Sequence, residues 1–475
     1  NGGAHIRDAY VHTLSQDGNL HLDVRTYEPC ILYVNGQYWG VYEIREKVDD
    51  LDYTSYYYDQ DDPNVQMLKT WGGTWSKYGG PQAQTDWNTF ESFVVSNNMA
   101  LPANWAYVDS VYNWKSLCDY IILNSICVTS DWLNWNTQWW RGLDTAGHAK
   151  RWRYCLWDND ATFGHYINYT GIPDTSPAAD PCNPQSLPDP GGQGHIPVLD
   201  ALMNNPIFYQ YYVNRYADLL NTTFSCDTMV TLLDTLTNRI APEMTGQCTR
   251  WGGSYTGWQT NVNTMRTYIQ TRCTAIQQGM IDCYSLTGPY NLTVDVVPAG
   301  AGTVNVNSIH LASSQLPWTG LYYGGINIIL QTAPTSSNYV FDYWELVNTP
   351  SPDSLSDSIT VNLASADHIV AHYHMIDNPP PTQTGSLFIP TAFSPNADGN
   401  NDVLHMHGTE GASYIDLVIY NRWGQKVFET TDPTQGWDGT TGGRECESGV
   451  YAYFLKVDYP DGTSTTKSGN ITLMR

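Results

Sequence analysis

The hydrophobic pattern of the chain changes near residue 287, and this change constrains the fold more than any other feature. Before it, segments with helical spacing alternate with strand-like segments. After it, PYNLTVDVVPAGAGTVNV begins a strict alternation of apolar and polar residues with Gly and Pro turns, which is typical of β structure. The proline-rich stretch 377–385 predicts a stiff, extended linker. We therefore expect a mixed α and β region over 1–286 and β modules over 287–376 and 386–475.

The composition argues against some classes of function. A formal charge of −25 is the opposite of the basic surface that nucleic-acid binding needs. No apolar run is long enough to span a bilayer. The chain starts without a methionine or an export signal, so we expect a processed portion whose first strands lie before Asn1. The ten cysteines include no CxxC pair, which argues against a zinc ribbon, and Cys273 and Cys283 are a candidate disulfide because they are close in sequence.

Local signals place the first elements. CILYVNGQYWGVYEIREKVD predicts a β-hairpin that turns at Asn35-Gly36, because both turn positions need a positive φ. NWKSLCDYIILNSICV has apolar residues at helical spacing and predicts a helix that ends near Thr129. Three more helices are expected at about 197–220, 227–243 and 260–282.

Short acids and amides lie among large aromatic residues just after the predicted helix. In SDWLNWNTQWWRG, Asp131 is followed five residues later by Asn136, and the strand-like RWRYCLW ends at Asp158 and Asp160. Protein kinases use this order: a helix, an Asp that orients the acceptor hydroxyl, an Asn that binds metal, a strand, and an Asp that holds Mg²⁺. Asn and Asp oxygens suit Mg²⁺ or Mn²⁺. On spacing alone, Asp158 and Asp160 could equally cap a helix or a turn.

Four stretches together resemble the spore-coat protein H kinase family, atypical secreted kinases with a trimmed kinase-like fold. They are LYVNGQYWGVYEIREKVD, SDWLNWNTQWWRG, WDNDATFG and NNPIFYQYYVNRYADLL, and the resemblance runs to about residue 284. It implies ATP with Mg²⁺ or Mn²⁺ as cofactors. It also implies that Asp131 is the catalytic residue, with Asn136, Asp160 and Asp158 as metal ligands.

The same resemblance suggests that Glu46, after the hairpin, orients a cation that contacts the nucleotide. A solvated charge on a strand explains Glu46 equally well. The sequence does not fix the cation that contacts the phosphates, for which Arg25, Arg45 and Lys47 are the candidates; Glu46 and Lys47 are together the predicted nucleotide-binding pair. An inactive scaffold therefore stays open, as does a carbohydrate-binding adhesin, because Trp and Tyr faces pair with sugar rings.

The two tail modules resemble parts of bacterial surface proteins. Residues 287–376, with AGAGTVNV and NYVFDYWEL, are similar to Gly-Tyr-x-Phe-x-x-Trp repeats, which serve as stalks or spacers; a plain β-sandwich with Trp344 in its core is the simpler interpretation. Residues 386–475, with IPTAFSPNADGNNDVL, IYNRWGQKVFE and GWDGT, resemble the gliding-motility-associated C-terminal domain, the type B sorting domain of the type IX secretion system. That resemblance implies recognition by the translocon and a location outside the cell or on its surface.

One loop of the last module has alternating oxygen side chains. They are Asn396, Asp398, Asn400 and Asp402, a spacing that Ca²⁺ loops use. No bidentate Glu follows at the position that an EF-hand would need. A turn rich in Asn and Asp, with side chains that satisfy their own backbone, explains the spacing equally well.

The sequence as a whole therefore predicts a multidomain protein: an α+β atypical kinase-like domain followed by two all-β, sandwich-like modules. The predicted function is phosphorylation of an unidentified secreted or surface protein with ATP and Mg²⁺.

Overall fold

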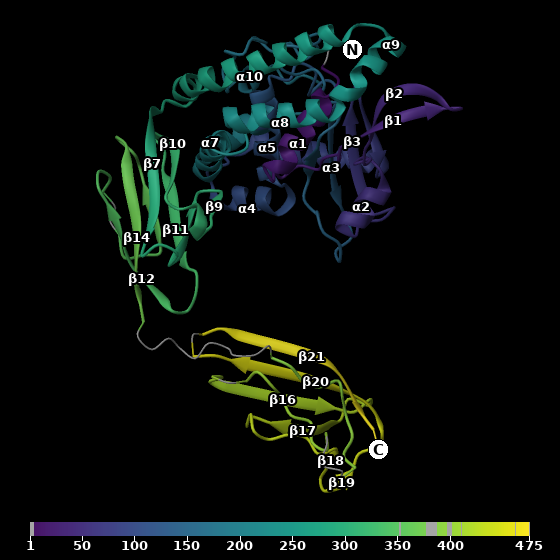
Figure 1. The fold of residues 1–475 in the computed structure, drawn as a ribbon, viewed down its shortest axis with the longest axis vertical. Coiled ribbons are helices and arrows are strands. Elements are labelled where there is room, and N and C mark those ends of the chain that lie inside the picture. Colours follow the sequence, from purple (N-terminus) through teal and green to yellow (C-terminus); the bar gives the residue numbers. More distant parts are fainter. Residues whose placement is uncertain are drawn as a thin grey trace. The chain divides into compact units, whose positions relative to one another are not determined.

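The computed structural model describes residues 4–350, 353–376, 387–396, 401–409, 411–460 and 462–474 (Figure 1). The predicted linker over 377–385 lies outside the described residues. The chain forms two compact units, which we describe separately. The first comprises 1–296, 303–332 and 343–371, and the second comprises 297–302, 333–342 and 372–475.

Helices and strands alternate in the first part of the first unit. The helices are α1 (Arg7–Asp17), α2 (Leu51–Tyr58), α3 (Gly80–Ser96), α4 (Pro102–Val111), α5 (Trp114–Cys127), α6 (His195–Met203), α7 (Pro206–Leu220), α8 (Cys226–Ile240), α9 (Met244–Trp251) and α10 (Tyr255–Tyr284). The strands are β1 (Glu28–Val34), β2 (Gln37–Ile44), β3 (Val65–Thr70), β4 (Thr74–Tyr78), β5 (Thr137–Gly142) and β6 (Arg153–Cys155). No helix within the described residues is long and apolar enough to cross a membrane.

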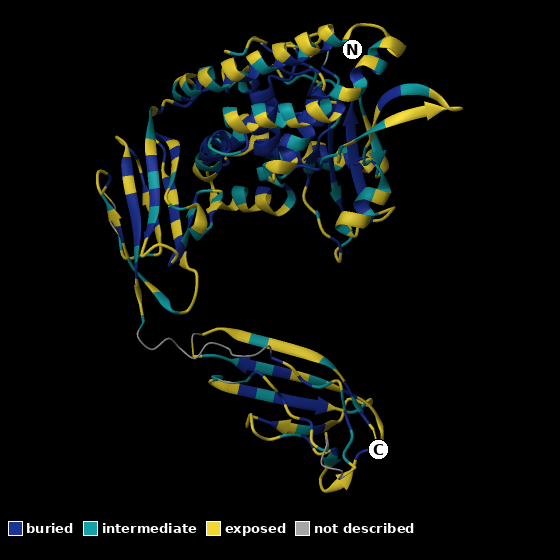
Figure 2. Ribbon diagram, viewed as in Figure 1, coloured by how far each residue is buried: buried dark blue, intermediate teal, exposed yellow. Residues whose placement is uncertain are grey.

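The predicted hairpin is confirmed. Strands β1 and β2 are antiparallel and turn at Asn35 and Gly36, whose φ angles are +51° and +76°. This left-handed pair is the geometry that a tight hairpin needs. The hairpin projects from the body of the first unit, and most of its residues are intermediate or exposed (Figures 1 and 2).

Helix α5 is the buried axis of the helical region. Every residue from Ser116 to Cys127 is buried, as expected for a helix that is apolar on nearly all sides (Figure 2). Asn113 caps its start by accepting a hydrogen bond from the Ser116 N–H. Its one buried carboxylate, Asp119, is paired with the Arg215 guanidinium at 2.9 Å. The chain leaves this helix directly into the segment that contains Asp131.

A four-stranded antiparallel sheet, in the order β4-β3-β5-β6, lies beside the helices. Its register pairs Gln138 of β5 with Cys155 of β6. The start of β5 and the end of β6 are therefore neighbours. Asn136 precedes β5 and Asp158 follows β6, so the sheet brings together two segments that are 22 residues apart in sequence.

The helix predicted over 197–220 is wrong as a single element, because the chain forms α6 and α7 instead. Asn205 ends the first helix and caps the second, accepting hydrogen bonds from the N–H groups of Ile207 and Phe208. Pro206 takes the first helical position, where its missing N–H is tolerated. The sequence also did not predict helices α1 to α4, which all lie before residue 113.

The predicted pairing of Cys273 with Cys283 is wrong. Both cysteines lie on α10, ten residues apart, which places them about 15 Å apart along the helix axis. A disulfide needs Cα atoms within about 7 Å. The structure instead pairs Cys182 with Cys283 and Cys226 with Cys273.

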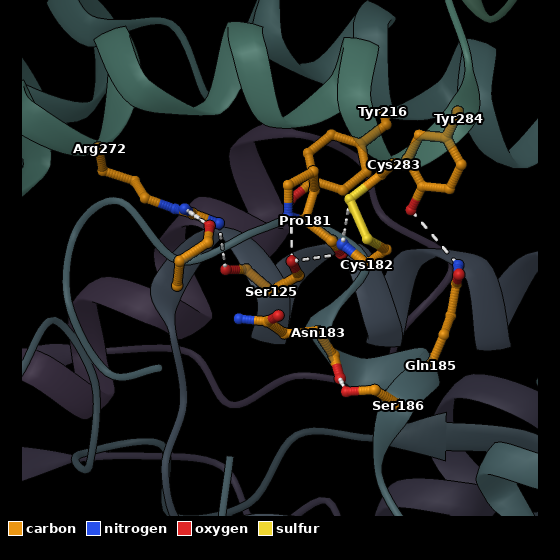
Figure 3. The surroundings of a disulfide bond; sticks show 11 residues. Ser125, Pro181, Cys182, Asn183, Gln185, Ser186, Tyr216, Arg272, Cys283 and Tyr284 are labelled. Carbon is orange, nitrogen blue, oxygen red and sulfur yellow. Dashed lines mark hydrogen bonds between the residues drawn. A yellow bond between two sulfur atoms is a disulfide. The ribbon is translucent and has the colours of Figure 1, made fainter. Parts of the chain in front are cut away.

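The Cys182–Cys283 disulfide lies where several elements meet (Figure 3). Ser125 of α5 donates a hydrogen bond to the Pro181 carbonyl at 3.0 Å and accepts one from the Tyr216 hydroxyl of α7 at 3.1 Å. Arg272 of α10 donates to the Ser125 carbonyl at 3.0 Å. The disulfide therefore ties the loop around Cys182 to α10 at a point where both already contact α5.

We expect each disulfide to stabilise the fold by about 2 to 5 kcal/mol, because they close loops of 101 and 47 residues in the unfolded chain. Cys283→Ser should lower the midpoint of guanidinium unfolding under oxidising conditions. The measurement is equilibrium unfolding of the variant and wild type, with and without reductant. A wild type whose midpoint is unchanged by reductant would contradict the expectation.

The β module after α10 is built from two four-stranded sheets, ordered β10-β7-β14-β12 and β13-β11-β8-β9. The strands are β7 (Thr287–Val297), β8 (Gly302–Val306), β9 (Ile309–Leu311), β10 (Trp318–Gly324), β11 (Ile328–Pro334), β12 (Tyr339–Leu346), β13 (Ser358–Val361) and β14 (Asp367–Met375). Trp344 is 2% exposed, which confirms its expected place in the core. Packing of the sheets as a sandwich stays a prediction.

Within the first unit, this module is fixed to helix α7. The buried Asp218 carboxylate accepts hydrogen bonds from the Ser308 N–H at 2.8 Å and the Tyr322 hydroxyl at 2.7 Å. The Asn221 side chain exchanges two hydrogen bonds with the backbone of Leu321. These polar contacts join the module to the helical region; the stalk function stays a prediction.

The second unit contains the C-terminal module, a five-stranded sheet ordered β15-β21-β20-β16-β17 and a small β18-β19 hairpin. Its strands are β15 (Ala392–Phe393), β16 (Tyr414–Tyr420), β17 (Lys426–Thr430), β18 (Thr440–Thr441), β19 (Arg444–Glu445), β20 (Gly449–Asp458) and β21 (Ser464–Leu473). Alternate residues of the long strands point into a core around the fully buried Trp437. The expected order, an α+β region followed by a mostly β region, is confirmed.

Candidate active site

Asn136 connects the two predicted acidic segments. Its Nδ2 donates to Asp131 Oδ2 at 3.1 Å, to the Asp131 carbonyl at 3.3 Å and to the Asp158 carbonyl at 3.3 Å. Its side chain is buried, and its φ of +46° lies in the left-handed region that Asn adopts more readily than most residues. We call Asp131, Asn136, Asp158 and Asp160 the acidic cluster.

Asp158 and Asp160 lie just beyond β6, on an exposed turn. Asp158 has a φ of +57°, and the Asp160 carbonyl accepts a hydrogen bond from the Thr162 N–H at 2.9 Å. Asn159, between them, is buried. The turn therefore directs two carboxylates outward while its middle residue is held inside.

A fourth carboxylate, Asp8 on α1, supports this turn, and the sequence did not predict it. Asp8 accepts the Asn159 N–H at 2.5 Å and forms an ion pair with Arg45. His12, one turn along α1, lies 3.4 Å away. Burial opposes ionisation of Asp8, but His12 and Arg45 outweigh it and hold its pKa well below the usual value. Only the i, i+4 spacing with His12 marked this residue in the sequence.

Of the three candidate phosphate contacts, Arg25 is the one whose side chain has no hydrogen-bond or ion-pair partner among the described residues. Among the described residues, its guanidinium makes no hydrogen bond or ion pair, and its Nε is buried. Its charge lowers the pKa of Asp158, against the larger effect of burial. The other two candidates are occupied: Arg45 by Asp8, and Lys47 by Asp50 at 2.9 Å.

Glu46 and Lys47 border a separate surface cavity of about 560 Å³ with tyrosines of α2. Glu46 accepts a hydrogen bond from the Tyr57 hydroxyl at 2.5 Å. Neither residue makes a hydrogen bond or ion pair with the acidic cluster, as far as the described part of the chain shows. Their nucleotide contact stays a prediction.

Lys69, near the end of β3, is a buried cation that the sequence did not predict. Its Nζ is 2.8 Å from Asp49 Oδ2 and 3.5 Å from the ring centre of Trp157, the residue before Asp158. Burial lowers the pKa of Lys69, although Asp49 opposes this. Lys69 therefore packs against Trp157, the residue that precedes the acidic turn.

Two regions of the chain match known protein families. Residues 3–276 match the family described as CotH kinase protein, which is more than half of the chain. The chain belongs to the CotH kinase family. Residues 387–473 match the CHU_C type IX secretion signal domain, so this CotH-family protein is secreted or displayed at the cell surface. No curated protein matches the chain.

The oxygen donors of the acidic cluster are of the kind that a hard cation such as Mg²⁺ binds. Asp131 Oδ1 and Asn136 Oδ1 are buried and have no hydrogen-bond partner. Such oxygens are costly to bury unless a ligand satisfies them. Within the described residues, no three His, Cys, Asp or Glu side chains converge to hold a metal by themselves. Mg²⁺ usually takes one or two carboxylates together with substrate phosphates and water, so the set is compatible with it.

The carboxylates of the cluster are hard to ionise together. Burial raises the pKa of Asp131 to about 6, and repulsion from Asp160 adds to it. Although Asp158 reaches the surface, the protein around it partly removes its hydration, and this desolvation raises its pKa to about 6, with Asp160 and Asp8 as the next causes. Burial and Asp8 raise the pKa of Asp160. A pKa near neutrality suits a general base.

These shifts predict a pH dependence of stability. Because the folded-state pKa values are raised, the folded protein binds more protons than the unfolded chain between about pH 4 and pH 6, so stability from these groups falls as the pH rises through that range. Asp131→Asn should therefore raise the melting temperature relative to wild type more at pH 7 than at pH 4.5.

Differential scanning fluorimetry over this pH range measures the effect, with Asp61→Asn, at an exposed position outside the cluster, as the matched control. A difference between Asp131→Asn and wild type that is the same at every pH would contradict the assigned shifts.

The predicted Ca²⁺ loop is only partly described. The Asn396 N–H donates to Asp402 Oδ1 at 2.9 Å, whereas Asp398 and Asn400 lie outside the described residues. Calcium binding stays a prediction.

Proposed function

We propose that this CotH-family protein transfers the γ-phosphoryl group of ATP to a hydroxyl of a secreted or surface protein. The observation that carries the proposal is the Asn136 side chain, which ties Asp131 to the Asp158 segment while both it and Asp131 keep an unsatisfied oxygen. Buried oxygens of this kind need a ligand or water to satisfy them. Their availability supports a site that is completed by a cation and a phosphate.

Each residue of the cluster has a distinct proposed role. Asp131 accepts the proton of the acceptor hydroxyl. In the same step the hydroxyl oxygen bonds to the γ-phosphorus, and the bond between the γ-phosphorus and ADP breaks. Asn136, Asp158 and Asp160 would hold Mg²⁺, which when bound neutralises charge on the phosphates. Arg25 supplies two N–H donors to a phosphate, because its guanidinium is unpaired beside Asp158.

Two substitutions separate these roles. Asp131→Asn keeps the shape but removes the proton acceptor, so phosphoryl transfer should fall by two orders of magnitude or more while ATP binding survives. Asp160→Ala removes a metal ligand and should weaken Mg²⁺-dependent ATP binding itself. Calorimetric ATP titration with and without Mg²⁺, and transfer of radiolabel to acceptor proteins, measure both. Equal loss of binding in the two variants would contradict the division of roles.

A matched pair of cation variants tests the phosphate contact. Arg25→Met should weaken ATP binding about tenfold or more, since one charged hydrogen bond contributes about 1.5 to 3 kcal/mol. Lys47→Met tests the contact predicted from sequence in the same titration. A wild type that neither binds ATP nor transfers label would instead favour a non-catalytic scaffold or adhesin.

We also propose that the translocon recognises residues 386–475 directly. Deleting them should leave the protein in the periplasm with the first unit folded, because that unit has its own core and both disulfides. Cell fractionation and a melting curve of the truncated protein measure the two outcomes. Normal release of the truncated protein into the medium would contradict this assignment.

A further inference from the structure

Four aromatic side chains form a continuous row beside the acidic cluster. Trp71 contacts Trp135 with ring centres 5.3 Å apart, Trp135 contacts Tyr169 at 5.7 Å, and Tyr169 contacts Tyr166 at 6.0 Å. We call these residues the aromatic rim. Three of them are strongly exposed: Trp71 by 60%, Tyr166 by 58% and Tyr169 by 43%. An exposed patch of this kind, next to a functional site, is typical of a binding surface.

The rim is fixed to the loop that contains Asp131. The Gly72 N–H donates to the Asn134 carbonyl at 2.9 Å, and the Asn134 amide donates to the Tyr169 carbonyl at 2.8 Å. Gly72 has a φ of +71°, and a Cβ there would approach the Trp135 ring to 2.9 Å, so only glycine allows this close contact. Trp135 itself lies between Asp131 and Asn136. Three separate segments thus hold the rings in place.

The rim is uncharged, whereas the adjacent cluster is acidic. None of the residues in 71–75, 134–136 and 165–169 is Asp, Glu, Lys or Arg. His165, which precedes Tyr166, lies within electrostatic reach of both Asp160 and the buried Arg7. An acidic partner would be repelled by the carboxylates, and the rim offers it no cation. Apolar and aromatic side chains would gain contact with the exposed rings.

We propose that the aromatic rim docks an extended segment of the acceptor polypeptide that carries apolar or aromatic residues, and no acidic ones, beside its phosphorylated hydroxyl. This inference rests on the proposed function. The ring-to-ring distances allow at most about five residues of extended chain along the row, at about 3.3 Å per residue. Its continuity with the Asp131 loop places a docked segment next to the group that receives the hydroxyl proton.

A Ser/Thr-centred positional-scanning peptide library, with radiolabelled ATP and Mg²⁺, tests the preference in the full-length protein. Wild type should select Trp, Phe, Tyr or Leu near the acceptor and discriminate against Asp and Glu. With the best peptide, Trp71→Ala and Tyr169→Ala should each raise KM about tenfold or more and leave kcat and ATP affinity within about twofold. Trp71→Phe should restore part of the loss.

Trp423→Ala is the matched control, because Trp423 is an exposed tryptophan of the sorting domain. An unchanged KM in both rim variants, or a preference for acidic peptides, would overturn the proposal. So would stronger binding of neutral oligosaccharides or lipid vesicles than of any library peptide, with that binding lost in Trp71→Ala.

A direct measurement of peptide binding distinguishes failure of phosphoryl transfer from failure of docking. If wild type transfers no label, fluorescence anisotropy with labelled apolar and acidic library peptides still measures the rim. Binding of apolar peptides that Trp71→Ala removes would support the docking surface and reject the chemistry. Absence of binding to any peptide would overturn the docking surface as well.

Discussion

The ion pair and hydrogen bonds of the largely enclosed Asp8 carboxylate are the contacts on which the acidic turn most depends. This carboxylate joins α1, the residue after the β1–β2 hairpin, and the acidic turn, through His12, Arg45 and the Asn159 N–H. A buried carboxylate needs such partners to stay ionised, and a buried ion pair that loses one partner becomes strongly destabilising. Replacing Asp8 would therefore remove one support of the turn and leave Glu43, at 3.2 Å, as the remaining partner of the Arg45 guanidinium. Asp8, together with Asn136, therefore sets the position of the exposed acids.

The second constraint is the register of the sheet. Because β5 and β6 are antiparallel neighbours, the residue before β5 and the residues after β6 must meet at one edge. Asn136 bridges the two segments at this edge, because its amide donates hydrogen bonds to both the Asp131 carboxylate and the Asp158 carbonyl. A neutral donor suits this position: it holds two acidic segments together without adding to the charge.

The sequence predicted the hairpin, α5 and the order of the site residues, because each depends on local signals. Asn35-Gly36 dictates its own turn, and α5 has apolar residues on nearly all sides. The unpredicted features depend on contacts between distant residues. Asp8 is an ordinary helical acid until the fold brings Asn159 to it, and the Cys182–Cys283 pair closes a loop of 101 residues that spacing cannot reveal. Asn205 and Pro206 are a local signal for a break between two helices. The apolar periodicity on either side of them nevertheless suggested one continuous helix.

The tryptophans of the segment after α5 explain how this charged site can be rigid. Trp132, Trp139 and Trp140 are at most 2% exposed, and Trp140 donates a hydrogen bond to the buried Asp23 at 2.7 Å. Trp135 alone among the four is turned toward the surface, into the aromatic rim. Three large buried side chains thus fix the backbone on both sides of Asn136, which limits the relaxation by which repelling carboxylates would otherwise separate. Burial is the largest cause of the raised pKa values of Asp131 and Asp158, and repulsion from Asp160 adds to it. The repulsion is retained by the packing rather than relieved, and a bound cation would relieve it.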